Sequence, residues 1–470
     1  MNPQRRWKVA ALALGIIWLR PNASVASGEP SGPLPVMQRG VQQISRDTIH
    51  GIGLSEDDTE VEPDVAVDPF NPSVVVATLA QGRNPDGASS ALGFATSHDG
   101  GLSWTAGTLP GLMTAQGGPW LRTGDSTVAF GPDGAVYIGV GGANRDTCER
   151  GLGVERSDDG GLTWSGPLYA QELVECDHFV DNESLTVDTF PASPHEGRLY
   201  LTYIRGFDFH PFAPIVMRYS DDRGETWSPM VVISGRIQGE GALPLVQPNG
   251  DLTVVYEDAI GPPFRLYAQT SNDGGATFTK PQVIARDEWR EAHGMRTGFG
   301  IPAAAVDPVT AGIFVVWQDG RFRDPLNDIL LIRSADGRHW GAPVRVNQDP
   351  EESRIDHLTP VVAAFAGEVH VTYFTRDDSG GYSRFLDERY IVSHDGGVTF
   401  GSETIVGDPI DLAYAATVFN LNGGVDRFLG DYNGIAAGPD GVHIVWCTAS
   451  KPPHPETYHQ TTWTATLVAH

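Results

Sequence analysis

An eight-residue phrase recurs along this chain and limits what the chain can fold into. It reads SHDGGLSW at 97–104 and returns at 157–164, 220–227, 271–278 and 393–400, with a shortened copy, SADGRHW, at 334–340. Each copy follows an apolar or alternating run and leads into another, which predicts a strand, a tight turn and a second strand. In such a turn the aspartate accepts backbone N–H groups and the glycines adopt positive φ. Six copies therefore predict an all-β chain built from repeated hairpins.

A second hairpin pattern alternates with the first. A short apolar strand reaches a turn rich in Pro, Asp, Asn or Gly, and a longer β-branched or aromatic strand follows. The pattern occurs at 62–80, 125–142, 183–205, 241–258, 301–319, 359–376 and 432–450. Each full unit thus holds four strands in about 50 to 70 residues, the size of a propeller blade.

The chain ends predict how such a propeller closes. The seventh unit has two strands and a third at 460–468, whereas an isolated strand lies at 36–47. If the N-terminal strand completes the last blade, no sheet edge stays exposed. We therefore expect one seven-bladed β-propeller of four-stranded blades over residues 27–470.

The first 26 residues have the pattern of a secretory signal. A basic head precedes an apolar run from Val9 to Leu19, and small residues follow. That run is too short to span a bilayer, although a membrane anchor is the alternative. We expect a secreted or periplasmic, soluble, monomeric protein with no membrane span. The formal charge of −27 makes nucleic acid an improbable partner, because phosphate binding needs basic surface.

The phrase Ser-x-Asp-x-Gly-x-Thr-Trp resembles the Asp-box, or BNR repeat, of sialidase-like propellers. The stretches EPDVAVDPFNP at 62–72 and FLGDYNGIAAGPDG at 428–441 are similar to exported bacterial BNR-repeat proteins. The resemblance implies that the Asp-box aspartates hold turns on the face away from the substrate. These structural residues are Asp99, Asp159, Asp222, Asp273, Asp336 and Asp395.

This sequence also departs from the sialidase pattern. Sialidases that resemble it usually have six blades and an Arg-Ile-Pro motif before the first box, which supplies one of three arginines that bind the sugar carboxylate. Here EPDVAVDP at 62–69 occupies that segment, and GIP at 300–302 has no preceding arginine. No motif in this sequence therefore identifies the three arginines that bind the sugar carboxylate in sialidases.

The expected topology indicates where a site would lie. In a propeller the first strand of each blade begins, and the second ends, on the face opposite the Asp-box turns. Strand starts there offer Asp125, Glu183 and Glu240 as catalytic candidates, beside Glu62, Asp64, Asp181, Asp356 and Asp431. Strand ends and loops offer Arg145, Arg205, Arg321, Arg376, Tyr256 and Tyr432 as substrate-binding candidates, beside Asp258 and Asp319. Guanidinium groups bind carboxylates or sulfates in bidentate fashion, and paired carboxyl groups cleave glycosidic bonds as acid and base or nucleophile.

No cofactor is expected, and calcium is kept as an alternative that no motif supports. His178, His293 and His357 lie beside strand starts but match no metal-ligand spacing, and RDDSGG at 376–381 lacks the spaced oxygen ligands of a calcium loop. Of the three cysteines, Cys148 and Cys176 fall in loops on one face of neighbouring blades. We predict a disulfide between them, because an exported protein meets oxidising conditions.

Two classes of function remain open at this point. One is a secreted enzyme that acts on glycans, either an exo-glycosidase for acidic sugars or a polysaccharide lyase. The other is a noncatalytic propeller that binds glycan or protein. The charged residues around the funnel favour the first, and the absent arginine motif favours the second.

Overall fold

The computed structural model describes residues 37–46, 49–50, 55–144, 146–174, 178–207, 213–258, 261–420, 424–452 and 457–468. The expected signal segment, residues 1–26, lies outside these residues. The described chain is all-β, as the repeats predict, and its only helices are three short 3-10 turns. Among these residues, no helix is both long and apolar enough to cross a membrane.

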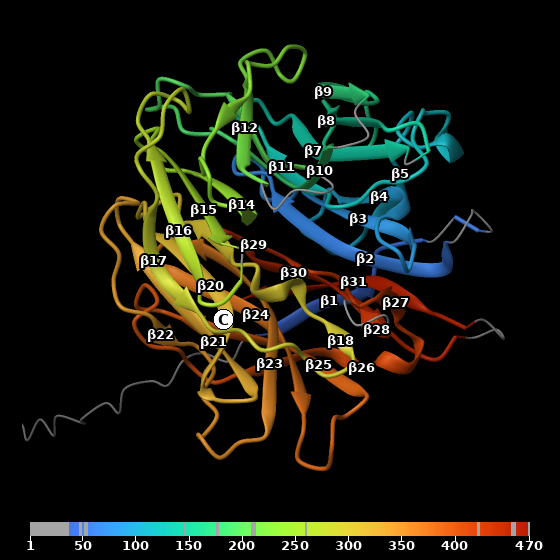
Figure 1. Cartoon of the computed structure of the whole chain (residues 1–470), viewed down its shortest axis with the longest axis vertical. Helices are drawn as coiled ribbons and strands as arrows, with labels where there is room; N and C mark the ends of the chain where they lie inside the picture. Colours follow the sequence, from blue (N-terminus) through green and yellow to red (C-terminus); the bar gives the residue numbers. More distant parts are fainter. Residues whose placement is uncertain are drawn as a thin grey trace, which may run out of the picture. The chain divides into compact units, whose positions relative to one another are not determined.

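Five antiparallel sheets each contain four strands in chain order (Figure 1). They are β6 (Thr127–Phe130), β7 (Val136–Asn144), β8 (Glu149–Ser157) and β9 (Leu168–Val174); β10 (His178–Val187), β11 (Leu199–Phe207), β12 (Ile215–Ser220) and β13 (Val231–Val232); β14 (Gly239–Val246), β15 (Leu252–Asp258), β16 (Phe264–Ser271) and β17 (Gln282–Asp287); β19 (Ala303–Val306), β20 (Ile313–Arg323), β21 (Leu326–Ser334) and β22 (Val344–Arg345); and β23 (Ile355–Phe365), β24 (Glu368–Asp377), β25 (Phe385–Ser393) and β26 (Thr404–Asp411).

The eight remaining long strands form one sheet with two halves. One half is β2 (Glu56–Val67), β3 (Val75–Arg83), β4 (Ser89–Ser97) and β5 (Thr105–Thr108); the other is β29 (Gly434–Gly438), β30 (Gly441–Ala449), β31 (Gln460–Val468) and β1 (Met37–Gln43). A single parallel bridge between Thr59 and Gln460 joins the halves. The N-terminal strand β1 pairs antiparallel with β31, and Gln43 lies opposite Trp463. The expected pairing of these two strands is thus present.

The first strands of the four-stranded units lie next to one another. In chain order β2, β6, β10, β14, β19, β23 and β29 each contact the following one, and β29 contacts β2. These seven first strands, the inner strands, therefore lie side by side.

A small additional sheet was not anticipated from the sequence. It consists of β18 (Met295–Arg296), β28 (Val425–Phe428) and β27 (Ala416–Phe419), with β18 parallel to β28. The 3-10 turns are η1 (Thr114–Gln116), η2 (Gly298–Gly300) and η3 (Leu412–Tyr414). This sheet brings segments more than a hundred residues apart in the sequence to one place.

Each Asp-box carboxylate organises its own turn. Asp99 accepts hydrogen bonds from the backbone N–H groups of Leu102 and Ser103 and from the hydroxyl groups of Ser97 and Ser103. These bonds lower the pKa of Asp99 to about 2, with the Ser103 hydroxyl contributing most. The same pattern recurs around Asp159, Asp222, Asp273, Asp336 and Asp395.

The Asp-box turns also dock on the preceding sheet. In three turns a backbone carbonyl accepts a hydrogen bond from a side chain of the preceding sheet. Thr96 donates to the Gly160 carbonyl at 2.6 Å, Arg198 to that of Gly274 at 2.8 Å, and Arg333 to that of Gly396 at 2.6 Å. The carbonyl of Gly101 in the first turn accepts from Gln42 of β1 at 3.2 Å. The turns therefore connect neighbouring sheets as well as neighbouring strands.

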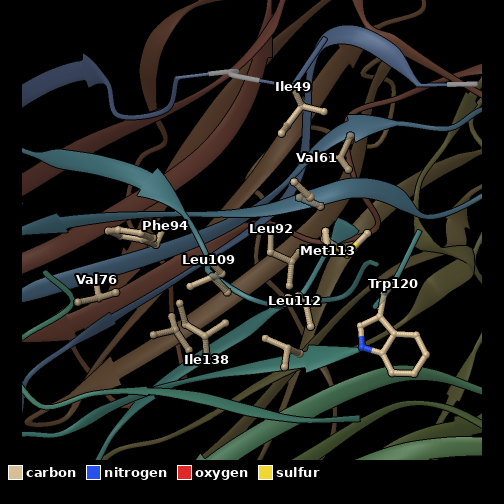
Figure 2. Close-up of a cluster of buried hydrophobic side chains, with 14 of the residues drawn as sticks. Ile49, Val61, Val76, Leu92, Phe94, Leu109, Leu112, Met113, Trp120 and Ile138 are labelled. Atoms are coloured by element: carbon tan, nitrogen blue, oxygen red, sulfur yellow. The ribbon is translucent and has the colours of Figure 1, made fainter. Parts of the chain in front are cut away.

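The apolar core lies between the sheets. β3 and β15 are buried along their whole length, because neighbouring sheets cover both of their faces. Figure 2 shows the cluster between the β2–β5 and β6–β9 units, including Val61, Leu92 and Ile138. At its edge the Trp120 indole N–H donates to the Tyr169 hydroxyl at 2.8 Å. This packing fixes the inner strands.

Two of the three cysteines lie in the described part of the chain. Cys148 is disulfide-bonded, and Cys447 carries a free thiol in the core. Cys176 lies outside the described residues, so the pairing of Cys148 with Cys176 stays a prediction.

Candidate functional site

A pocket of about 710 Å³ lies where the inner strands begin. Its charged lining comes from strand starts, strand ends and the loops beside them. The carboxyl groups are those of Glu62, Asp125, Asp181, Glu183, Glu240 and Asp431, and the guanidinium groups are those of Arg83, Arg122, Arg150 and Arg296. All three residues expected to be catalytic, Asp125, Glu183 and Glu240, are in this set.

An irregularity shared by the inner strands places these side chains. Glu62, Asp125 and Asn182 adopt left-handed φ of 55°, 51° and 55°. The pairing register shifts nearby in β2, β10 and β14. Such bulges re-aim side chains, and non-glycine residues in this conformation cluster at functional sites. The strand starts are therefore shaped to present polar groups to the pocket.

Asp125 and Asp181 form a carboxyl pair inside the pocket. The Asp125 carboxylate accepts the backbone N–H of Asn182 at 3.3 Å, on the strand that carries Asp181. Desolvation and the adjacent Asp125 carboxyl raise the pKa of Asp181 well above its usual range. Two neighbouring carboxyl groups resist ionising together, so the pair favours a state in which one of them holds a proton. The pair can donate a proton to a bound molecule.

The pKa values of three further carboxyl groups of the pocket are also raised. Desolvation, followed by the charge of Asp125, raises the pKa of Glu62 to about 8 and that of Glu183 well above its usual range. The pKa of Glu240 rises because of desolvation and Asp431. Glu183 packs on Gly141, where an added Cβ would come within 2.5 Å of Glu183 Oε1. The pocket therefore carries less negative charge than six ionised carboxyl groups would give it.

Arg83 and Arg296 lie against the same aromatic ring. The Arg83 guanidinium carbon is 4.5 Å from the Phe428 ring centre, and that of Arg296 is 5.2 Å away. Arg296 Nε also donates to Asp431 Oδ1 at 2.9 Å, and the second nitrogen contacts Oδ2. Arg83 Nε is buried and has no hydrogen-bond partner in the described part of the chain. Phe428 thus holds two like charges at one wall of the pocket.

Arg122 is fixed by a neighbouring loop. It makes a bidentate pair with Asp86 at 2.7 and 3.0 Å, and it donates to the Gly87 carbonyl at 2.8 Å. Arg150, at the start of β8, completes the set of arginines that line the pocket. Because Asp86 already occupies its bidentate face, Arg122 gives the pocket a fixed positive charge.

Tyr432 lines a second cavity, of about 280 Å³, which we call the channel. Asn182, Glu183 and Ile301 line both cavities, so the two lie next to each other at these residues. Desolvation and the charges of Asp125 and Glu62 raise the pKa of the Tyr432 phenol well above its usual range. Its hydroxyl therefore stays protonated.

The other binding candidates that the structure describes lie away from the pocket, because local partners hold them. Arg321 pairs with Asp319 at 2.6 and 2.7 Å, and Arg376 donates to the carbonyls of Ser383 and His293 at 2.6 Å. Arg205 lies beside Met230. Tyr256 is fully buried, stacks on Tyr267 at 5.5 Å and donates to Gln269 at 2.7 Å, so it belongs to the core. Arg145 lies outside the described residues.

His293 and His357 do not line the pocket either. His293 stacks on Tyr382 with ring centres 4.2 Å apart, and the side chain of His178 lies outside the described part of the chain. His357 lies near Asp349 and Glu403, the one group of potential metal ligands in the described residues. Its Nε2 is 2.8 Å from Asp349, its Nδ1 is 2.8 Å from Arg323, and Glu403 accepts from Tyr373. Hydrogen bonding accounts for this cluster.

The sequence reasoning missed all four arginines of the pocket. Arg83 ends the second strand of its hairpin, the position that drew attention to Arg145 and Arg205, so the same rule could have found it. Arg122 and Arg150 lie in or beside loops. Arg296 lies on β18, whose partner strand begins at Val425, and no local pattern indicates that pairing.

Comparison with known families supports the repeat assignment. The BNR/Asp-box repeat model matches residues 218–229, one of the six boxes. A search of curated protein sequences found no match.

Solved structures with similar folds are distant in sequence. A polysaccharide lyase, PL25 ulvan lyase, is 11% identical with a TM-score of 0.52, and the match covers 92% of this chain and 96% of the lyase. The same lyase bound to -[GlcA(1-4)Rha3S]- gives 12% identity, a TM-score of 0.52 and the same coverage. A protein of unknown function from Dyadobacter fermentans is 17% identical with a TM-score of 0.48, over 76% of this chain and 99% of the other. The sialidase of Trypanosoma rangeli is 14% identical with a TM-score of 0.45, and the match covers 77% of this chain and 59% of the sialidase.

These likenesses show the fold and no more. The chain resembles the Asp-box β-propellers. Its activity has to be argued from its own pocket.

Proposed function

We propose that this chain is a secreted β-propeller that acts on glycans carrying acidic sugars, with the pocket at the start of the inner strands as its active site. The observation that carries this proposal is the meeting of protonated carboxyl groups with fixed arginines in one cavity. Glycosidic bonds break when a carboxylic acid protonates the leaving oxygen, and arginines bind a sugar carboxylate or sulfate.

The proton donor in this proposal is the Asp125–Asp181 pair. Asp181 has the raised pKa and faces the open pocket, and Asp125 supports it from the neighbouring strand. The two groups hydrogen-bond, so they are too close to flank a glycosidic bond from opposite sides. Glu240 on β14 and Glu183 on β10 are the candidates for the second carboxyl group.

Recognition of the acidic group is assigned to the arginines. Arg83 and Arg150 line the cavity and are the candidates for direct contact. Arg122 and Arg296 are paired with Asp86 and Asp431, so their role is to shape the wall and add positive charge. A lyase reaction uses the same recognition, because arginines that neutralise a uronate carboxylate also ease removal of the adjacent proton.

Seven inner strands in mutual contact support a closed propeller of seven blades. The seventh blade would consist of β29, β30, β31 and β1, so the N-terminal strand completes it. Residues 1–26 would be removed on export, and the mature chain would act as a monomer without a cofactor.

The test is a panel of sialosides, uronic-acid polysaccharides, sulfated glycans and neutral glycans incubated with the parent protein. Mass spectrometry of the products separates the reactions, because hydrolysis adds water and a lyase leaves an unsaturated uronate. We expect cleavage of an acidic glycan only. Binding without cleavage would support the noncatalytic alternative, and cleavage of neutral glycans alone would contradict the role of the arginines.

A further inference from the structure

The channel is lined by a buried amide side chain that has no hydrogen-bond partner in the described part of the chain. Asn433 is 4% exposed and lines the channel. Neither its amide nitrogen nor its amide oxygen has a hydrogen-bond partner in the described part of the chain. Buried polar groups are almost always hydrogen-bonded, because an unpaired one loses its water without compensation. Asn433 therefore points to a ligand or to ordered water.

The rest of the channel wall combines apolar side chains with hydroxyl groups and offers no cation. Hydroxyl groups come from Ser126, Thr127, Ser184, Thr186 and Tyr432, and no arginine or lysine is among the lining residues. The pocket has four arginines. An anionic group would thus find a counter-charge in the pocket and none in the channel.

The channel also offers little stabilisation to a cation. Asp64 and Glu183 are the two carboxyl groups of the channel. Asp64 already accepts the backbone N–H of Val65 at 2.8 Å and that of Val128 at 2.9 Å. Desolvation and the charge of Asp125 raise the pKa of Glu183, so this group stays neutral. Electrostatics therefore select an uncharged occupant.

The size of the channel limits the occupant further. Its volume of about 280 Å³ is well under half of the 710 Å³ of the pocket, and the two cavities share Asn182, Glu183 and Ile301. A sugar ring in the pocket could therefore extend one substituent past Glu183 into the channel.

We propose that the channel binds an uncharged, hydrogen-bonding arm of the glycan, such as an acylamino group, with the Asn433 amide as its main contact. This inference rests on the function proposed above and adds a second element of specificity to it. The arginines select the acidic group of the sugar, and the channel selects a neutral arm on the same sugar.

The test uses two acids that differ in one arm. Glucuronic acid and N-acetylglucosaminuronic acid share the carboxylate, and only the second carries an amide. We expect the second to bind the parent protein at least about tenfold more tightly by calorimetry, since two hydrogen bonds are at stake. Asn433→Ala should remove this preference and leave the affinity for glucuronic acid unchanged. Asn433→Asp, which keeps the shape and replaces the donor, should also remove it.

Matched variants separate this inference from the proposed function. Asn347 is another buried asparagine, hydrogen-bonded and outside both cavities, so Asn347→Ala should keep the preference. Arg150→Gln should weaken both acids equally. Equal binding of the two acids to the parent, with loss in Arg150→Gln, would overturn the channel inference and leave the function intact. Failure of both acids to bind the parent would overturn both.

Discussion

Arg296 and Asp431 form a bidentate ion pair at the wall of the pocket, although 135 residues separate them in the sequence. The inserted strand β18 carries Arg296, and Asp431 directly precedes β29. Phe428 covers the same guanidinium and that of Arg83. The small sheet of β18, β27 and β28 therefore positions charge for the pocket.

Phe428→Leu tests this positioning. Loss of the ring removes a cation–π contact from Arg83 and from Arg296, so we expect affinity for an acidic glycan to fall about tenfold. The buried position also predicts a loss of about 1 kcal/mol in stability, visible as a lower melting temperature. Unchanged affinity in the folded variant would show that Arg83 needs no support from this ring.

The Asp-box aspartates should affect stability and not binding. Asp99→Ala removes four hydrogen bonds from an exposed turn, so we expect the melting temperature to fall by roughly 1–3 °C. Glycan affinity should stay unchanged, because the turn does not line the pocket. Glu351→Ala, an exposed change in a loop, serves as the control. Loss of glycan binding in Asp99→Ala at unchanged melting temperature would mean that the site lies on the Asp-box face.

The buried carboxyl groups give the protein a predictable response to pH. Desolvation raises the pKa of Glu388 to about 8, and this residue lies outside the pocket, hydrogen-bonded to Thr372. Because the pKa of this group is raised in the folded state, its contribution to the free energy of unfolding is fully present below the unfolded pKa, near pH 4.5. That contribution is lost as the pH rises toward 8. Glu388→Gln should therefore gain on the order of 2 kcal/mol at pH 8 relative to the parent and little at pH 5. Denaturant unfolding at both values measures this, and an equal effect at both would contradict it.

Deletion of residues 27–48 tests the proposed closure. The deletion removes β1 and its pairing with β31, exposes an edge strand and takes away the Gln42 contact to the first Asp-box turn. We expect a loss of several kcal/mol in the free energy of unfolding and a tendency to aggregate. Calorimetry and size-exclusion chromatography measure both, and a variant as stable as the parent would contradict closure by β1.

The fold followed from local patterns, because alternating strands and turn residues are encoded within a few positions. The strand at 460–468 and the N-terminal strand near 36–47 were both predicted, and β31 and β1 occupy these places. Most carboxyl groups of the pocket were also predicted, because the sequence shows where each inner strand starts.

The arginines were harder to predict. A strand-end arginine can turn into the pocket, as Arg83 does, or can be captured by a nearby acid, as Arg321 is by Asp319. The outcome depends on neighbours that only folding brings together. Arg296 reaches the pocket through a sheet formed by distant segments, which no periodicity reveals.

The most direct test of the proposed function is the rate at which Asp181→Asn cleaves the acidic glycan that the parent cleaves, with Glu388→Gln as the matched buried-carboxyl control. Asparagine keeps the shape of Asp181 and cannot donate the proton of a carboxylic acid, so we predict at least a hundredfold lower kcat with glycan affinity and melting temperature close to those of the parent. The control should keep the parent rate. Full activity in Asp181→Asn would contradict the assignment of the Asp125–Asp181 pair as the proton donor.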